Sequence, residues 1–269
     1  MEFYSLPQRP NGHGQSYALN FGASKAANPY ICFLDDDDSW TDDGYLARAE
    51  KAITNRFPSP DLVFSNQSAF FHDRKKDGPI WLEGLAEKLE NAGRSLDADG
   101  LYKIDADDLT RYGRFCHLNT MIVRRALYES VGGMDEGIRW ECDHDLYLRL
   151  IDVAQSMWLS PVIVSRHNIP DPAAASSMTT MLNETQRRLY QLSVFNKASL
   201  YAERPAIRAY GRRHLGYTLK RIASTLAQAG DYRTAAFYAW QAMGALPTVK
   251  WFVYANYLTI RSMGGKGIG

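Results

Sequence analysis

Tyr30–Trp40 reads YICFLDDDDSW, a short apolar run followed at once by four aspartates. A continuous apolar segment of this length, bounded by polar residues, is typical of a strand buried in an open α/β sheet. Ligands of such sheets bind beyond the carboxyl ends of the strands, which is where these aspartates begin. The stretch therefore predicts a buried strand that delivers several carboxylates to a ligand site.

The spacing of the aspartates indicates which of them work together. On an extended backbone, side chains two positions apart share a face, so Asp35 and Asp37 are expected to converge and Asp36 to point away. Carboxylates held close together raise each other's pKa unless a cation neutralises them. Mg²⁺ and Mn²⁺ prefer oxygen ligands and commonly combine one or two carboxylates with substrate phosphates. We therefore predict a cation–diphosphate site on Asp35 and Asp37; the alternative is a solvated acidic loop.

Strand and helix patterns alternate on both sides of this stretch, which is typical of an α/β domain. Residues 73–112 interrupt the alternation, because they are polar and irregular, and we expect an insertion there with one short helix around Leu82–Leu89. Strands are expected over residues 1–6, 30–34, 61–71, 119–123 and 160–168, and helices over 16–27, 44–55, 125–131 and 141–154.

From Glu184 onward the pattern is helical only. Gly230 followed by Asp231 is a typical stop and cap, and Pro247 precedes the last segment. The run LAQAGDYRTAAFYAWQAMGALP resembles one tetratricopeptide-like helical hairpin. We predict an α/β domain over residues 1–183 and a helical region over 184–269. The expected helices are 184–202, 205–229, 231–245 and 248–262.

The net charge of +1 on 269 residues conceals an asymmetry. Residues 1–183 contain 18 Lys/Arg and 27 Asp/Glu, whereas residues 184–269 contain 13 Lys/Arg and 3 Asp/Glu. The basic region is suited to anionic lipid or phosphate groups, and the alternative is that the two regions attract each other. We expect peripheral membrane contact through the basic helices and no nucleic-acid partner.

No apolar run approaches the roughly eighteen residues needed to span a bilayer. The three cysteines lie far apart, and no secretory leader pattern is seen at Met1. Both observations favour a cytoplasmic location. The basic helices would place the protein at the inner face of the membrane.

Three blocks together resemble the signature of family 2 glycosyltransferases. NGHGQSYALNFGASKAANPYI overlaps YICFLDDDDSW, and NTMIVRRALYESVGGMDEGIRWECDHDLYLRL follows in the same order as in that family, within residues 11–150. The resemblance implies a GT-A (Rossmann-like) mixed sheet with flanking helices. It also implies an inverting, metal-dependent hexosyltransferase that moves sugar from a UDP- or GDP-sugar to a glycan or lipid-linked hydroxyl, in cell-surface polysaccharide or glycolipid synthesis.

The resemblance further implies roles for single residues. Asp37 would bind Mn²⁺ or Mg²⁺, Asp35 would face the ribose or the metal shell, and Asp38 would support the loop. Asp143 would be the general base that deprotonates the acceptor hydroxyl, with Glu141 as the alternative. The first turn of a helix, where we expect Asp143, favours a carboxylate. The remaining candidates are Asn20, Asp35, Asp36, Arg166 and His167 on the donor side, and His117, Asn119 and Trp140 on the acceptor side.

The sequence also departs from the family pattern. The nucleobase-binding β-α-β unit that normally precedes the first block is not recognisable, and Cys142 stands where an acid is usual. A second hypothesis is therefore a truncated, non-catalytic relic that acts as a helical interaction protein. A metal-dependent phosphate-ester hydrolase ranks third because no nucleophile motif is seen. A zinc site is disfavoured because no compact ligand spacing exists among Cys116, His117, Cys142, His144 and His167.

Overall fold

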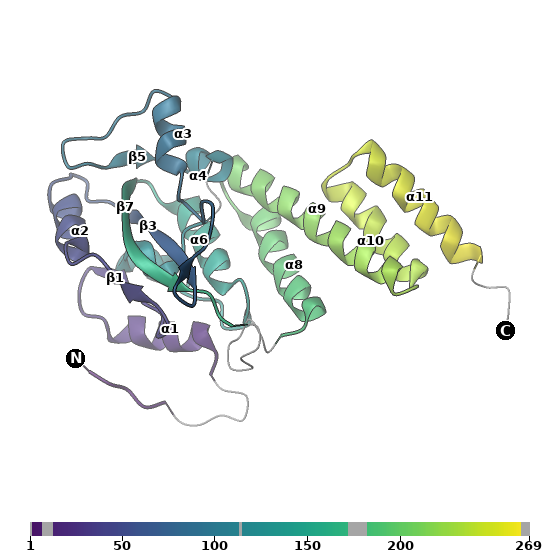
Figure 1. Cartoon of the computed structure of the whole chain (residues 1–269), viewed down its shortest axis with the longest axis horizontal. Helices are drawn as coiled ribbons and strands as arrows, with labels where there is room; N and C mark the ends of the chain where they lie inside the picture. The colour runs from purple at the N-terminus through teal and green to yellow at the C-terminus, as the bar shows by residue number, and fades with distance from the viewer. Residues whose placement is uncertain (1, 7–12, 113–114, 172–181, 265–269) are drawn as a thin grey trace. The chain divides into compact units, whose positions relative to one another are not determined.

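The computed structural model describes residues 2–6, 13–112, 115–171 and 182–264 (Figure 1). The chain divides into two compact units, Met1–Asp171 and Pro172–Gly269, and each is described by itself. The sequence placed the domain boundary after residue 183, whereas the compact units divide after residue 171. Residues 172–181 lie outside the described part of the chain.

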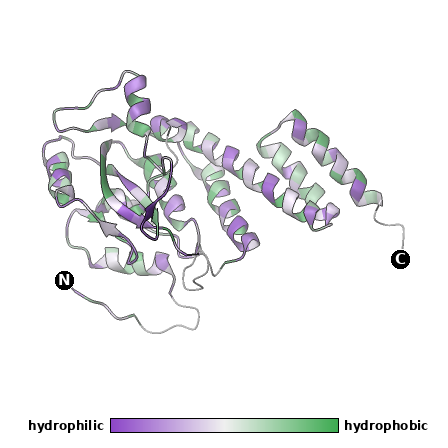
Figure 2. Ribbon diagram, viewed as in Figure 1, coloured by the Kyte–Doolittle hydropathy of each residue, from purple (hydrophilic) through white to green (hydrophobic). Residues whose placement is uncertain are grey.

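The first unit is built on one mixed sheet of seven strands. Its strands are β1 Tyr30–Cys32, β2 Ser39–Trp40, β3 Leu62–Phe71, β4 Arg74–Lys75, β5 Tyr102–Ile104, β6 Met121–Arg124 and β7 Met157–Asn168. The strand order is β1-β6-β3-β7-β2, with β4 paired to β3 and β5 paired to β7. β3 and β7 run parallel, and the other described pairs are antiparallel. In Figure 2, β7 is hydrophobic along much of its length, as expected of a central strand.

Helices cover both faces of this sheet. They are α1 Gln15–Lys25, α2 Tyr45–Thr54, α3 Leu85–Asn91, α4 Ala106–Tyr112, the 3₁₀ helix η1 Leu118–Thr120, α5 Arg125–Ser130 and α6 Cys142–Val153. Adjacent strand residues point to opposite faces, so Val63 of β3 joins the cluster that contains Tyr45 and Ala49 of α2. Phe64 points the other way and meets Tyr147 of α6, with 6.0 Å between ring centroids.

The register of the sheet determines where the acidic loop lies. β1 enters the loop paired to β6, and β2 leaves it paired to β7, with Ser39 opposite Arg166. β7 ends at Asn168, so its last residues run beside the loop. His167 thereby reaches Asp38 although the two are 129 positions apart in the sequence.

Two expectations for the first unit are corrected. Residues 2–6 form no strand; the ring of Tyr4 packs on Phe21 at 5.5 Å between centroids, and Phe3 is 85% exposed. The segment 73–112 contains α3 close to the expected helix, but also β4, β5 and α4. β5 has three residues and pairs with the distant β7, so no local period could indicate it.

The second unit is helical, as predicted. Each described helix packs against the next, and the described helices are α8 Glu184–Tyr201, α9 Pro205–Gln228, α10 Tyr232–Ala245 and α11 Val249–Gly264. Asn183 and Gln186 form a capping box at the start of α8, and Asp231 caps α10 by accepting from the amide of Thr234. Gly230 takes the positive φ of 82° needed between α9 and α10. None of the described helices is long and apolar enough to cross a membrane.

Candidate active site

The four aspartates lie in a tight turn and not on extended backbone. The amide of Asp38 donates to the carbonyl of Asp35 at 3.2 Å, which folds the chain back on itself. The expected pairing of Asp35 with Asp37 is therefore only part of the cluster. The turn gathers Asp35, Asp37 and Asp38, whose carboxylate oxygens lie within 4.8 Å of one another, while Asp36 is exposed.

Asp38 is the anchor of this acidic cluster. Its side chain is 0% exposed and accepts a hydrogen bond from Nδ2 of Asn119. It also accepts from the amide of Asn168 at 2.7 Å and lies 2.8 Å from Nδ1 of His167. A buried carboxylate needs such partners, because removal from water is otherwise very costly. Asp38 thus connects the acidic loop to β7 and to η1 through these contacts.

Asn119 accepts hydrogen bonds from Asp35 and Trp40 through both its side chain and its backbone. Its Oδ1 accepts from the amide of Asp35 at 2.9 Å, and its carbonyl accepts from Nε1 of Trp40 at 2.8 Å. The sequence assigned Asn119 to the acceptor side. In the structure the residue is buried and its hydrogen bonds go to the acidic loop and to Trp40.

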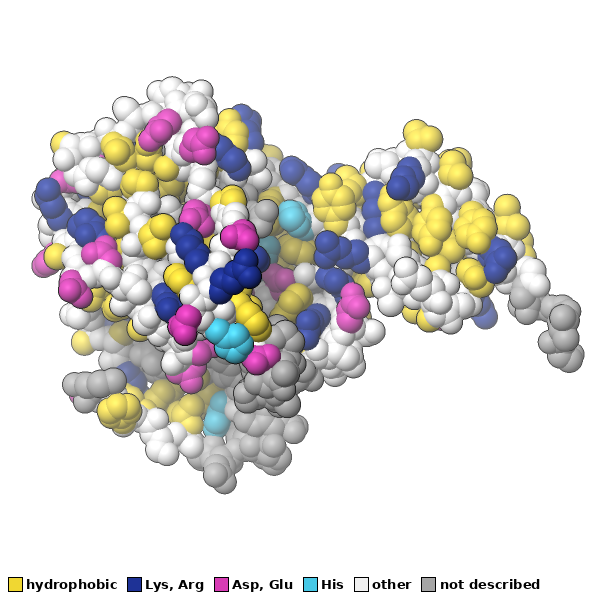
Figure 3. All heavy atoms as spheres, viewed as in Figure 1, with side chains coloured by type: hydrophobic (Ala, Val, Ile, Leu, Met, Phe, Trp, Pro, Cys, Tyr) yellow, Lys and Arg dark blue, Asp and Glu magenta, His cyan; other side chains and the backbone are white. Residues whose placement is uncertain are grey.

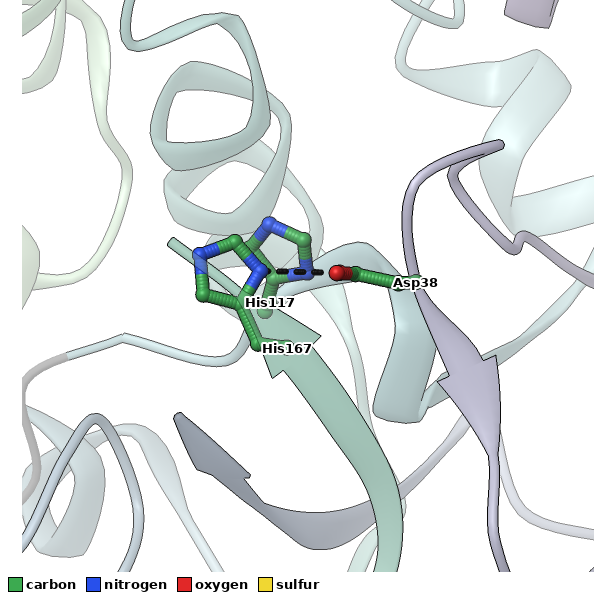
Figure 4. Close-up of side chains that lie close together, drawn as sticks. All are labelled: Asp38, His117 and His167. Carbon is green, nitrogen blue, oxygen red and sulfur yellow. Dashed lines mark hydrogen bonds and ion pairs between the residues drawn. The ribbon is translucent and has the colours of Figure 1, made fainter. Parts of the chain in front are cut away.

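Two imidazoles complete the cluster. His117 and His167 lie with their rings 5.0 Å apart, and both are directed towards Asp38 (Figure 4). Nε2 of His117 is 3.7 Å from Oδ2 of Asp35, while its Nδ1 is buried and has no hydrogen-bond partner among the described residues. Asp38, His117 and His167 form a second set of groups with metal-ligand spacing, which shares Asp38 with the carboxylate set.

Burial and neighbouring charges both act on the ionisation of the cluster. Burial raises the pKa of Asp35, and the charges of Asp38 and Asp143 add to this effect, while His117 and Gln15 oppose it. Burial, and then the charge of Asp38, raise the pKa of Asp37. Removal from water is thus the larger cause of both shifts, and repulsion between the carboxylates adds to it.

The cysteines do not contribute to this cluster. Burial raises the pKa of the Cys116 and Cys142 thiols to about 12, which keeps both protonated at neutral pH. Among the described residues, neither metal-capable set contains a cysteine. The zinc set disfavoured from the sequence is therefore not assembled in the described part of the chain.

The start of α6 brings further acids near the cluster. Asp143 lies in the first turn of this helix, as expected, and accepts from the amide of His144 at 2.8 Å. Glu141, the residue that caps the helix, has a positive φ of 64° and lies 2.9 Å from Nδ1 of His144. Such a conformation is strained for a residue with a side chain and is enriched at functional sites.

Gln15 connects this helix to the acidic loop. Its Nε2 donates to Asp35 at 3.1 Å, and its Oε1 accepts from the thiol of Cys142 at 3.4 Å. Cys142 is the residue before Asp143, the predicted base. Gln15 therefore links the acidic loop to the start of α6, where Asp143 lies.

Asn20, expected on the donor side, is hydrogen-bonded within the protein. Its Nδ2 donates to the carbonyl of Met134 at 3.0 Å and to Glu136 at 2.9 Å. Its Oδ1 accepts from the hydroxyl of Tyr128 and from the amide of Met134. These bonds connect α1 to α5 and to the GGMDE turn that precedes α6.

Arg166 has partners outside the acidic cluster, among them the carboxylate of Asp73 at 3.3 Å. It follows the alternation of β7 and lies on the face opposite His167. Its guanidinium donates to the carbonyl of His72 and to Oδ1 of Asn168, and it stacks 4.3 Å from the ring of Phe70. Trp140, assigned to the acceptor side, lies half-buried in the loop before α6.

Several residues of the site were not singled out from the sequence. Trp81 lies in the segment expected to be irregular, yet its ring centroid is 5.1 Å from that of His117 and 4.9 Å from that of His167. It has a positive φ of 44°, which no local pattern indicates. The other residues missed are Gln15 and Asn168, and His144 was weighed only as part of a disfavoured zinc set. Only Asn168, beside a predicted strand end, had a usable signal.

Residues 6–78 match the family model Glycosyl transferase family 2. The matched segment contains all four aspartates of the acidic loop. A comparison with curated proteins found no match.

Solved structures show the same fold. The S. aureus TarS fragment 1–349 in complex with UDP-GlcNAc is similar with a TM-score of 0.58 and 12% identity, over 94% of this chain and 69% of that one. Its complex with UDP gives 0.56 and 13%, over 94% and 68%. A longer TarS structure gives 0.54 and 12%, over 94% and 41%. The predicted GT-A-like sheet with flanking helices and a helical C-terminal region is thereby confirmed.

Proposed function

We propose that this chain is a glycosyltransferase that moves a sugar from a nucleoside-diphosphate donor to a hydroxyl group. The observation that carries the proposal is the gathering of Asp35, Asp37 and Asp38 at the end of β1, beside the start of α6. The family 2 match over this loop and the likeness to TarS, which was solved with UDP-GlcNAc and with UDP, support it. A UDP-sugar is the first donor to test.

A divalent cation fits the residues that are present. Asp35 and Asp37 offer carboxylate oxygens that suit Mg²⁺ or Mn²⁺, and the neighbouring imidazoles favour Mn²⁺. Because Asp38 engages Nδ1 of His167, it leaves Nε2 of that ring for an ion, an arrangement common around protein-bound metals. When bound, such an ion would stabilise the charge of the departing nucleoside diphosphate.

Asp143 is our choice for the base. A carboxylate in the first turn of α6 is stabilised by the helix dipole and can accept the proton of an acceptor hydroxyl. The hydroxyl oxygen would form a bond to the anomeric carbon as the bond to the diphosphate oxygen breaks, from opposite sides, so that the configuration inverts. Glu141 is the alternative base, although its carboxylate is already engaged by His144.

The first experiment tests the metal–donor site. Titration of the full chain with UDP- and GDP-sugars, with and without Mn²⁺, should show metal-dependent binding. Asp37→Asn should weaken that binding at least about tenfold, because it removes a ligand charge. Asp36→Asn is the matched control, since Asp36 is exposed and outside the cluster. Nucleotide binding that is absent, or that D36N and D37N alter equally, would contradict the proposal and favour a non-catalytic interaction protein.

The second experiment tests the base. Asp143→Asn should lower sugar transfer to the best acceptor by about 10²–10⁴-fold while donor affinity stays near wild type. Glu141→Gln, assayed in parallel, separates the two candidates, and Asp107→Asn on α4 is the control for a distant helix acid. A larger loss in E141Q than in D143N would transfer the role to Glu141.

A further inference from the structure

The last two helices leave an apolar face without a partner. α11 buries Ala255 and Leu258 completely in a cluster that also contains residues of α10, while its opposite side is open. On that side Val249 is 82% exposed, Ile260 69% and Met263 70%. We name as the outer apolar face the exposed side chains of Trp240, Val249, Phe252, Val253, Ile260 and Met263.

This face is continuous across the two helices. Residues 249, 253, 260 and 263 are separated by four, seven and three positions and therefore form one stripe along α11. The ring of Phe252 meets the ring of Trp240 from α10 edge-on, with 5.9 Å between centroids. The indole Nε1 of Trp240 donates to Oγ1 of Thr259 at 3.1 Å, which fixes the ring against α11. Figure 2 shows hydrophobic positions along both helices, and Figure 3 shows hydrophobic side chains exposed over them.

Asn256 lies within the stripe, on the same side as Val253 and Ile260. Its Nδ2 donates one hydrogen to the carbonyl of Phe252 at 2.8 Å. Its other N–H and its Oδ1 would be hydrogen-bonded by water or headgroups at the depth where an interfacial helix lies. An exposed apolar area of this kind usually marks a contact with another surface.

Charge distinguishes between the surfaces that could cover this face. Arg233 is exposed on α10, four and seven positions before Phe237 and Trp240, and Lys250 and Arg261 are exposed on α11. No aspartate or glutamate follows Asp231 in the chain. The unit carries 13 Lys/Arg against 3 Asp/Glu. A second copy of the chain would bring the same positive residues to this face, and the like charges would repel each other. Anionic headgroups would attract these residues instead.

We propose that the outer apolar face docks on an anionic lipid bilayer. Its apolar side chains would enter the boundary between headgroups and acyl chains, and Arg233, Lys250 and Arg261 would reach the headgroup phosphates. The attachment is peripheral, because none of the described helices can span a membrane. The proposal rests on the second unit alone and does not depend on the transferase chemistry.

Sedimentation with vesicles tests this docking directly. The full chain should bind vesicles of phosphatidylcholine mixed with phosphatidylglycerol, should bind pure phosphatidylcholine more weakly, and should lose affinity as salt is raised. Val253→Ser combined with Ile260→Ser should lower partitioning about tenfold or more. Leu189→Ser is the matched control, because Leu189 is a 53% exposed leucine on α8 in the same unit, and it should leave binding unchanged.

A second variant separates charge from apolar contact. Lys250→Gln should weaken binding to the anionic vesicles by about fivefold and leave binding to neutral vesicles unchanged. Thermal unfolding by circular dichroism verifies that each variant is folded. Three results would overturn the proposal: no binding to anionic vesicles, equal losses in V253S/I260S and L189S, or a dimer in light scattering that V253S/I260S abolishes. The last would assign the face to a second copy.

Discussion

Asp37 and Asp38 are neighbours in the chain, yet their carboxylates occupy opposite environments. The Asp38 side chain is fully buried and engaged by Asn119, His167 and Asn168. Asp37 is exposed, and the contact it receives from Asn168 goes to its backbone carbonyl. Asp38 therefore holds the loop in place through its hydrogen bonds, whereas the carboxylate of Asp37 is available to a ligand.

The raised pKa of Asp37 should lower the free energy of unfolding of the chain at neutral pH. Burial, and next the charge of Asp38, raise the pKa of Asp37 above its ordinary value of 3.8. Ionised Asp37 therefore destabilises the folded chain at neutral pH, and this penalty disappears as the pH falls through the raised pKa. In the presence of a chelator, Asp37→Asn should be more stable than wild type at about pH 7, with a difference that shrinks towards about pH 4.

Urea denaturation at several pH values measures this difference. Asp36→Asn at the exposed neighbouring position serves as the control. A stability gain that does not change with pH, or that D36N reproduces, would show that Asp37 is not strained by its surroundings. Saturating Mn²⁺ should remove the advantage of D37N, because the ion binds only the charged cluster.

At the residue scale, the sequence predicted residue types better than their partners. The acidic cluster, His117, His167 and the helix-start position of Asp143 could be recognised from local order. The contacts of Asn20 with Met134 span 114 positions, and those of Asn119 with Asp35 span 84. No local pattern encodes pairings over such separations, so the hydrogen bonds that these two residues make to a turn and to the acidic loop could not be predicted.

At the scale of elements, the helices with caps were the most predictable. The second unit's helices start and end within two residues of expectation, because Asn183, Asp231 and Gly230 signal their ends. The two-residue strands β2 and β4 and the three-residue β5 were not predicted, since they exist only through pairing with β3 and β7. Cap chemistry is local, whereas strand pairing is not.

Two glycines in neighbouring helices make the packing of the second unit testable. A Cβ on Gly216 of α9 would lie 2.4 Å from Cβ of Leu246, so Gly216→Ala should destabilise the chain by about 1–3 kcal/mol. Gly244 in α10 has nothing within 4 Å of such an atom, and Gly244→Ala should stabilise by about 0.5–1 kcal/mol. Thermal or urea denaturation of both variants measures the contrast. Equal effects would mean that α9 and the end of α10 do not approach as described.

At the scale of the whole molecule, two units of opposite charge share one chain. The first unit carries 18 Lys/Arg and 27 Asp/Glu, and the second 13 and 3, so a net charge of +1 results from large opposing values. Near its pI of about 7.7 the chain has little net repulsion between copies. Attraction between the acidic unit of one copy and the basic unit of another then becomes important.

Salt should therefore raise solubility near the pI. Static light scattering at about pH 7.7 should show weaker attraction in about 300 mM NaCl than in about 20 mM, because the shorter Debye length screens opposite charges on different copies. An uncharged osmolyte at equal osmolality is the control. Stronger association at high salt would indicate that apolar contact, such as self-association of the outer apolar face, dominates instead.

The hydrogen bonds of Asp38 also have a consequence for the order in which the chain folds. The three residues that engage its carboxylate lie 81, 129 and 130 positions downstream. Contacts of such high sequence separation require large loops to close first and therefore form late. We therefore expect the acidic loop to stay hydrated during folding until β7 has joined the sheet. The acidic cluster would then be among the last parts of the first unit to form.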